Sequence, residues 1–218
     1  MKKRKEDNMK IVTIRADFLK SFLQMKAKHS KELHTRHQYK NIVFQENKMV
    51  FCADGSFLIA YDLEVNNMTD NSTGERIQLN FNNINKTAEK MLMNSSGNLV
   101  ITFDESLKRE DREISIKTDD GLSCIFTDHD WDFPSLEIAE VLQPIHTIDN
   151  LRSKGHNHFI FNPSLMMEIM KYIENSADTG NRKTTTLKIT EGNMLIMKFS
   201  IDLEKDLEGY VILMGVRS

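Results

Sequence analysis

The sequence lacks long apolar runs and contains little cysteine. Its longest uninterrupted apolar stretch, residues 57–61, is far shorter than the roughly 20 residues that a membrane-spanning helix needs. The first eight residues are charged and no apolar segment follows them, so no secretory signal peptide is expected. The two cysteines, Cys52 and Cys124, fit lone buried thiols in a reducing compartment better than a disulfide. These absences predict a cytoplasmic protein that has no membrane partner.

The motifs of common catalytic and nucleotide-binding sites are also missing. The sequence has no P-loop, no Gly-rich dinucleotide fingerprint and no Gly-x-Ser-x-Gly elbow. The alternative is a metal site made of acidic residues. Asp128, Asp130 and Asp132 would lie on one side of an extended segment, and three carboxylates can bind Mg²⁺. A metal-dependent enzyme is therefore kept as an alternative. The main expectation is a protein with no catalytic residues, no metal and no cofactor.

The charge that is present is unevenly distributed. The net charge is −3, which argues against a surface that is basic all over. Between positions 16 and 40, however, the bases clearly outnumber the acids, which are Asp17 and Glu32. A mildly acidic protein with one basic face can still bind DNA through that face, although a solvated helix face explains the same pattern.

One order of elements, strand-helix-strand-strand-strand, is predicted three times along the chain. Residues 48–62 read as two strands joined at Asp54-Gly55, a hairpin signal because Gly accepts a positive φ. Asp17 is the expected N-cap of the first helix, in which Phe18, Phe22 and Met25 recur at helical spacing. The predicted strands are residues 11–14, 39–44, 49–53, 58–63, 76–81, 99–103, 113–117, 122–126, 158–161, 184–190, 194–201 and 210–216. The predicted helices start at positions 17, 83 and 163. This repetition is the strongest organisational signal in the sequence.

Several segments of this sequence carry a family resemblance. Residues 53–58 read Ala-Asp-Gly-Ser-Phe-Leu, residues 132–134 Asp-Phe-Pro, residues 141–144 Val-Leu-Gln-Pro and residues 161–165 Phe-Asn-Pro-Ser-Leu. The sequence ends Tyr-Val-Ile-Leu-Met-Gly-Val-Arg-Ser. As an ordered set they resemble a shortened member of the bacterial DNA polymerase III β-subunit (DNA sliding clamp) family. That family has Thr-Asp-Gly-His-Arg-Leu at the first position and ends Tyr-Val-Val-Met-Pro-Met-Arg-Leu.

The resemblance implies an α+β DNA-clamp fold of three such repeats, with the strands in outer sheets and the helices on the inner face. It divides the chain into a flexible basic tail (1–8), a complete clamp-like domain of two repeats (9–144) and a half-domain with the C-terminal strand (145–218). Three departures stand against it: Ser56-Phe57 replaces a His-Arg pair, Gly215 replaces a proline, and one half-domain is missing before His158.

Two sites are implied by position in the family. The first is a sequence-independent surface for duplex DNA on the helices, because lysines meet phosphates as flexible point charges and do not read base edges. The matching residues are Lys20, Lys26, Lys28, Lys86, Lys90 and Lys171. The second is an apolar groove that takes short peptides from DNA polymerases and clamp-loader-like proteins. The matching residues are Leu58, Pro134, Val141, Ile212, Met214, Val216 and Arg217.

The implied role is a processivity factor that forms a homo-oligomeric ring around DNA. Because an odd number of repeats per chain does not close a ring simply, the number of chains stays open. A clamp-like adaptor or decoy that binds clamp partners without forming a ring is the alternative within the same fold. The reduced size suggests a phage or another mobile element.

Overall fold

A computed structural model of the chain describes residues 8–29, 36–45, 47–53, 57–64, 76–132, 163–176, 185–189, 194–202 and 204–214. The chain forms two compact units. The first comprises Met1–Met49 and Leu63–Phe133, and the second comprises Val50–Asp62 and Pro134–Ser218. These compact units do not test the predicted division into 1–8, 9–144 and 145–218, which stays a prediction. Among the described residues, no helix is both long and apolar enough to cross a membrane.

The first unit contains a four-stranded antiparallel sheet. Its strands, in spatial order, are β1 (Met9–Arg15), β6 (Asn98–Asp104), β7 (Glu113–Thr118) and β8 (Ser123–Thr127). Alternate residues point into the core, as expected for a sheet with one solvated face. Val12, Ile101 and Ile116 occupy one cross-strand row and are fully buried. The same unit contains the antiparallel pair β2 (Asn41–Gln45) and β5 (Ile77–Asn80), and the short 3₁₀ helices η1 (His37–Lys40) and η2 (Arg109–Asp111).

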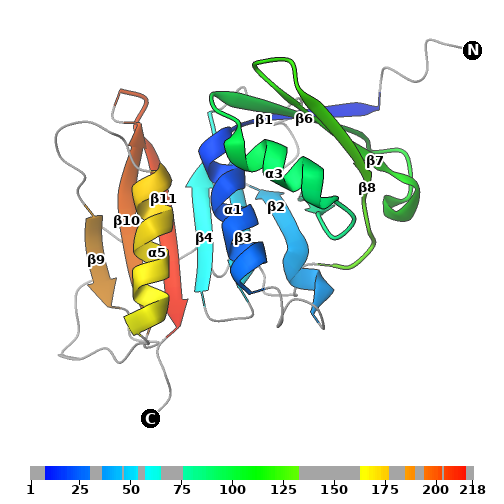
Figure 1. The fold of residues 1–218 in the computed structure, drawn as a ribbon. Coiled ribbons are helices and arrows are strands. Elements are labelled where there is room, and N and C mark those ends of the chain that lie inside the picture. Colours follow the sequence, from blue (N-terminus) through cyan, green and yellow to red (C-terminus); the bar gives the residue numbers. More distant parts are fainter. Residues whose placement is uncertain are drawn as a thin grey trace, which may run out of the picture. The chain divides into compact units, whose positions relative to one another are not determined.

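Two helices of the first unit, α1 (Ala16–Lys28) and α3 (Lys86–Asn94), lie side by side (Figure 1). The apolar face of α1 is buried, and its Phe22 ring meets Phe81 edge-on with the centroids 5.2 Å apart. Phe81 in turn contacts Phe126 of β8 at 5.1 Å. These rings join the helix to the strands of its own unit.

The second unit is a sheet with one helix against it. Strands β4 (Phe57–Asp62), β11 (Leu207–Met214), β10 (Met194–Asp202) and β9 (Thr185–Ile189) are neighbours in that order, and β3 (Lys48–Ala53), which begins in the first unit, lies beside β4. Helix α5 (Pro163–Ser176) packs against β11 (Figure 1).

Glycine at position 209 has a packing reason in this unit. A Cβ added to Gly209 would lie 2.2 Å from the Phe199 ring, which stands edge-on to Tyr61 with the centroids 6.2 Å apart. Any larger residue at this position would therefore displace the aromatic pair from the core.

The structure confirms the expected α+β class and, among the residues that it describes, the predicted order of elements. The predicted hairpin strands are β3 and β4, while the Asp54-Gly55 turn and the predicted strand 158–161 lie outside the described residues. The strand predicted from position 39 begins only at Asn41, because His37–Lys40 form the 3₁₀ helix η1.

The prediction that Asp17 is the N-cap of the first helix was wrong. The helix begins at Ala16, its N-cap is Arg15 without a side-chain hydrogen bond, and Asp17 lies in the first turn. Asp17 instead accepts a hydrogen bond from Arg15 Nη2 at 3.0 Å. A carboxylate in the first turn still interacts favourably with the positive end of the helix dipole.

Candidate functional site

Five of the predicted DNA-contacting lysines lie on the two neighbouring helices of the first unit. We call Lys20, Lys26 and Lys28 of α1 together with Lys86 and Lys90 of α3 the lysine face. Only two acids share these two helices, Asp17 and Glu89. The helices α1 and α3 lie side by side, so these five lysines belong to neighbouring elements of one unit.

The members of the lysine face differ in how available they are. Lys28, Lys86 and Lys90 are exposed. Lys26 is half-buried and forms an ion pair with Glu89, which ties α1 to α3. Lys20 Nζ lies 3.9 Å from Asp17 Oδ1. The three exposed lysines are therefore the best placed to contact phosphates, whereas Lys26 also has a structural role.

Lys40 is a basic residue of this region that the site prediction missed. Its Nζ donates to Asn82 Oδ1 at 2.8 Å and lies 3.1 Å from His37 Nδ1. Burial lowers the pKa of Lys40, and the positive charge of Lys26 lowers it further, while Glu89 acts in the opposite direction. The sequence showed Lys40 only as one base in a basic stretch. Its proximity to Lys26 depends on how η1 packs.

Lys171 lies in the second unit and has different neighbours. It is exposed on α5, a helix that also carries Glu168 and Glu174. Glu168 is buried and accepts a hydrogen bond from the Tyr172 hydroxyl. Burial raises the pKa of Tyr172, and the bond to Glu168 raises it further, so Tyr172 stays a donor. Helix α5 therefore has more acid than base and differs in charge from the lysine face.

Two residues of the predicted peptide groove are direct neighbours. Leu58 of β4 and Ile212 of β11 face each other as a cross-strand pair in the second unit. Their exposed fractions are 5% and 2%, so both side chains pack within the core of this unit. Met214 ends β11 opposite Met194. The other predicted groove residues, Pro134, Val141, Val216 and Arg217, lie outside the described residues.

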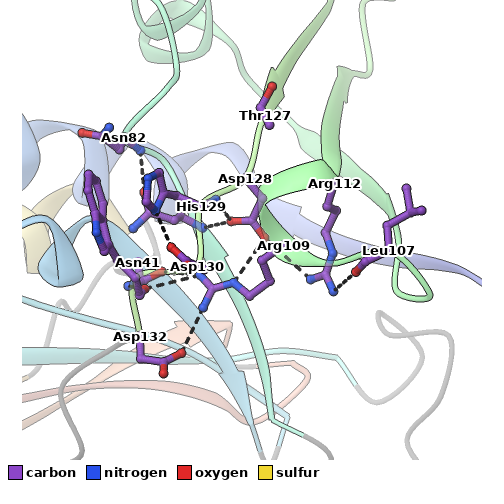
Figure 2. Close-up of polar contacts among 12 residues, drawn as sticks. Asn41, Asn82, Leu107, Arg109, Arg112, Thr127, Asp128, His129, Asp130 and Asp132 are labelled. Atoms are coloured by element: carbon purple, nitrogen blue, oxygen red, sulfur yellow. Dashed lines mark hydrogen bonds and ion pairs between the residues drawn. The ribbon is translucent and has the colours of Figure 1, made fainter.

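The three acidic residues of the metal-enzyme alternative do not converge. Asp128 is fully buried, and its Oδ1 accepts the backbone N–H groups of Asn80 and His129 at 2.7 and 2.8 Å. Its Oδ2 lies 3.5 Å from Arg109 Nε and 3.6 Å from Arg112 Nη1, which makes long ion pairs rather than hydrogen bonds (Figure 2).

The other two carboxylates have different partners. Asp132 Oδ1 lies 3.2 Å from Arg109 Nη1, and Asp130 Oδ1 lies 3.0 Å from His129 Nδ1. The part of the chain that the structure describes contains no group of three acidic, histidine or cysteine side chains arranged to hold a metal ion. The geometry therefore does not support the metal-dependent enzyme. The sequence could not show this, because the arginine partners come from the separate segment 109–112.

Comparison with known proteins gives structural matches only. No protein-family model matches the sequence, and no curated protein matches it either. A β clamp of Helicobacter pylori is similar with a TM-score of 0.57 and 13% identity, over 97% of this chain and 67% of that one. The proliferating cellular nuclear antigen of Entamoeba histolytica is similar with a TM-score of 0.52 and 15% identity, over 95% of this chain and 99% of that one. This chain has the sliding-clamp fold. At these identities the likeness shows the clamp fold alone.

A further match shows how the length of this chain compares with that of the bacterial clamps. A putative DNA polymerase III β subunit of Eubacterium rectale is similar with a TM-score of 0.53 and 15% identity, over 96% of this chain and 66% of that one. The chain therefore spans about two thirds of these bacterial chains and nearly all of the Entamoeba chain.

Proposed function

We propose that this protein is a sliding-clamp-like processivity factor that encircles duplex DNA as a homo-oligomer and tethers replication or repair proteins. The observation that carries the proposal is the clamp fold, which is shared with β clamps and with proliferating cellular nuclear antigen along nearly the whole chain. A protein that holds other enzymes on DNA needs no catalytic residues and no cofactor of its own, and the proposed role includes none.

The lysine face supports the DNA part of the proposal. A surface of flexible ammonium groups binds the phosphate backbone without reading bases, as a protein that moves along DNA requires. Lys28, Lys86 and Lys90 are the proposed principal contacts because they are exposed. Lys20 and Lys26 are proposed to add charge from half-buried positions. Lys171 belongs to the proposal by its place on α5, although the acids of that helix weaken its contribution.

The tethering part rests on the predicted peptide groove. Polymerase and clamp-loader-like peptides are the proposed ligands, with Leu58 and Ile212 in its floor because they are paired and buried. Met214 follows on β11, and Pro134, Val141, Val216 and Arg217 complete the proposed site by sequence position. Apolar anchors supported by few polar contacts are typical of such peptide sites.

Exchange of the exposed lysines tests DNA binding. We expect Lys28→Ala, Lys86→Ala and Lys90→Ala together to weaken binding to duplex DNA about tenfold or more at low salt, because each lost phosphate contact also removes a counterion-release contribution. The slope of log affinity against log salt should become shallower by about 2 to 3. The matched control is the triple Lys108→Ala, Lys117→Ala and Lys205→Ala, which removes the same charge from exposed positions outside the helices. Equal losses in both triples would contradict the proposed surface.

Topology of the DNA and solution mass test the ring. At moderate salt a closed ring stays on a circular duplex and slides off once the duplex is cut. A protein that binds one side of the DNA is released equally from the circular and from the cut duplex. Light scattering over a concentration series gives the number of chains. A monomer at every concentration would exclude a ring formed by this chain alone and would leave a clamp-fold adaptor that binds partner peptides.

A further inference from the structure

The side chain of Trp131 lies between two imidazole rings in the first unit. The His37 and Trp131 rings are stacked with centroids 4.1 Å apart and an interplanar angle of 12°. On its other face, Trp131 stacks on His129 at 3.5 Å and 21°. We call these three residues the histidine–tryptophan stack. All three are half-buried, so water and protons reach the stack.

Hydrogen bonds hold the backbone on both sides of the stack. The Trp131 carbonyl accepts from Asn41 Nδ2 at 2.7 Å and from Arg109 Nη2 at 3.4 Å. The His37 carbonyl accepts from Asn80 Nδ2 at 3.2 Å. The stack therefore joins η1 to the segment that follows β8, and the stacked rings are the side-chain part of that junction.

The two imidazoles have neighbours of opposite charge. His37 Nδ1 lies 3.1 Å from Lys40 Nζ. An ammonium has only donors, so Nδ1 can accept from it only while the imidazole is neutral. Beyond Lys40 lie Lys26 of α1 and Glu89 of α3, which are paired with each other. His129 instead lies 3.0 Å from the Asp130 carboxylate. Arg109 also faces this side of the stack, and it pairs with Asp128 and Asp132.

We propose that His37 is a pH-sensitive anchor, which holds Trp131 on the first unit while its imidazole is neutral and releases it when the imidazole is protonated. Protonation removes the lone pair that accepts from Lys40 and places a second cation beside that ammonium. Attraction between a protonated imidazole and the indole face opposes release, but it is available to both histidines, whereas the repulsion from Lys40 acts on His37 alone.

The anchor has a defined place in the chain and does not depend on the proposed function. Trp131 comes two positions before Phe133, and Pro134 and Val141 of the predicted groove follow along the sequence. Whatever the protein binds, the stack fixes the point at which the chain continues from the first unit into this segment. Neutral His37 keeps that point fixed near pH 7.5, and protonated His37 loosens it near pH 5.5.

Intrinsic fluorescence of the full-length protein tests the anchor, because Trp131 is the only tryptophan in the chain. Between pH 8 and pH 5 we expect the emission to shift to longer wavelength as the indole gains contact with water, with a midpoint within about one unit of the ordinary imidazole value of about 6.5. His37→Gln should remove this transition. His129→Gln and the control His29→Gln, at the end of α1, should keep it.

A second variant distinguishes a pH-sensitive anchor from a merely structural contact. Lys40→Met removes the ammonium whose repulsion drives the release, so the emission of this variant should no longer shift between pH 8 and pH 5. It remains informative if His37→Gln does not fold. The proposal is overturned if the wild-type emission does not change down to pH 5, or if His37→Gln or Lys40→Met shows the same transition as the wild type.

Discussion

At the scale of single residues, Asp128 is the side chain on which the end of β8 depends. It is fully buried, accepts two backbone N–H groups and lies between two arginines. Asp128→Asn keeps the shape and one acceptor oxygen but turns an amide donor toward the N–H groups of Arg109 and Arg112, which need an acceptor. We expect the free energy of unfolding to fall by about 1–3 kcal/mol, measured by urea unfolding at pH 7. Asp130→Asn, on an exposed neighbour, should stay within about 0.5 kcal/mol of the wild type.

The pH dependence of that loss follows from the environment of Asp128. Burial raises its pKa above the ordinary 3.8, and the N–H groups of Asn80 and His129 and the charges of Arg109 and Arg112 only partly oppose this. The Asp128 carboxylate is therefore protonated at a higher pH in the folded state than in the unfolded chain. As the pH falls from above the folded-state pKa toward 3.8, the folded state binds this proton first, and the free energy of unfolding rises. Asn cannot titrate. The stability gap between wild type and Asp128→Asn should widen from pH 7 to pH 4, and a gap that narrows would show that the arginines prevail over burial.

At the scale of elements, the lysine face depends on how α3 begins. The Asn85 side chain accepts the backbone N–H of Ala88 at 2.8 Å and caps the helix that carries Lys86 and Lys90. Asn85→Ala should cost about 1 kcal/mol in the free energy of unfolding, since a helix-terminal N–H loses its acceptor. Asn85→Asp is the matched control, because a carboxylate accepts the same bond and should keep the stability near that of the wild type. An equal loss in both variants would show that Asn85 acts by something other than capping.

Elements were predictable from the sequence where one local pattern decided them. The spacing of Phe18, Phe22 and Met25 predicted α1, because burial of one face dominates the choice of conformation. The boundaries failed where side chains make longer-range contacts. The chain turns through η1 before β2, where Lys40 and His37 bond to each other and to Asn82 and Asn80.

The candidate site, too, could be predicted only where it depends on local spacing. Helical spacing placed Lys28, Lys86 and Lys90 at positions that are exposed in the structure, since such spacing depends only on residues three and four positions apart. Spacing did not predict that Lys26 pairs with Glu89, that two arginines surround Asp128, or that two histidines enclose Trp131. Each of those contacts joins segments that are distant in sequence, so only the packing of the folded chain brings them together.

At the scale of the whole molecule, self-association is the step on which the proposed ring depends, and β8 is where we expect it to occur. Among the described strands, β8 is the last of the four-stranded sheet and has a hydrogen-bonded neighbour on one side. Its residues, Ser-Cys-Ile-Phe-Thr, include no charge and no proline, the features that usually protect such an edge from pairing. Ile125 is 60% exposed on this strand. Head-to-tail pairing of a sheet edge between copies can close a ring.

A charge on that edge provides the decisive comparison. Ile125→Lys places an ammonium on the exposed side of β8, and we expect it to lower the average mass in light scattering at concentrations where the wild type is oligomeric, with the urea midpoint of the monomer little changed. Leu122→Lys is the control, because Leu122 is also exposed, at 48%, but lies in the turn before the strand. If both variants keep the wild-type mass, the chains associate through another surface. If both lose it, added charge alone accounts for the effect, and the edge of β8 has no special role.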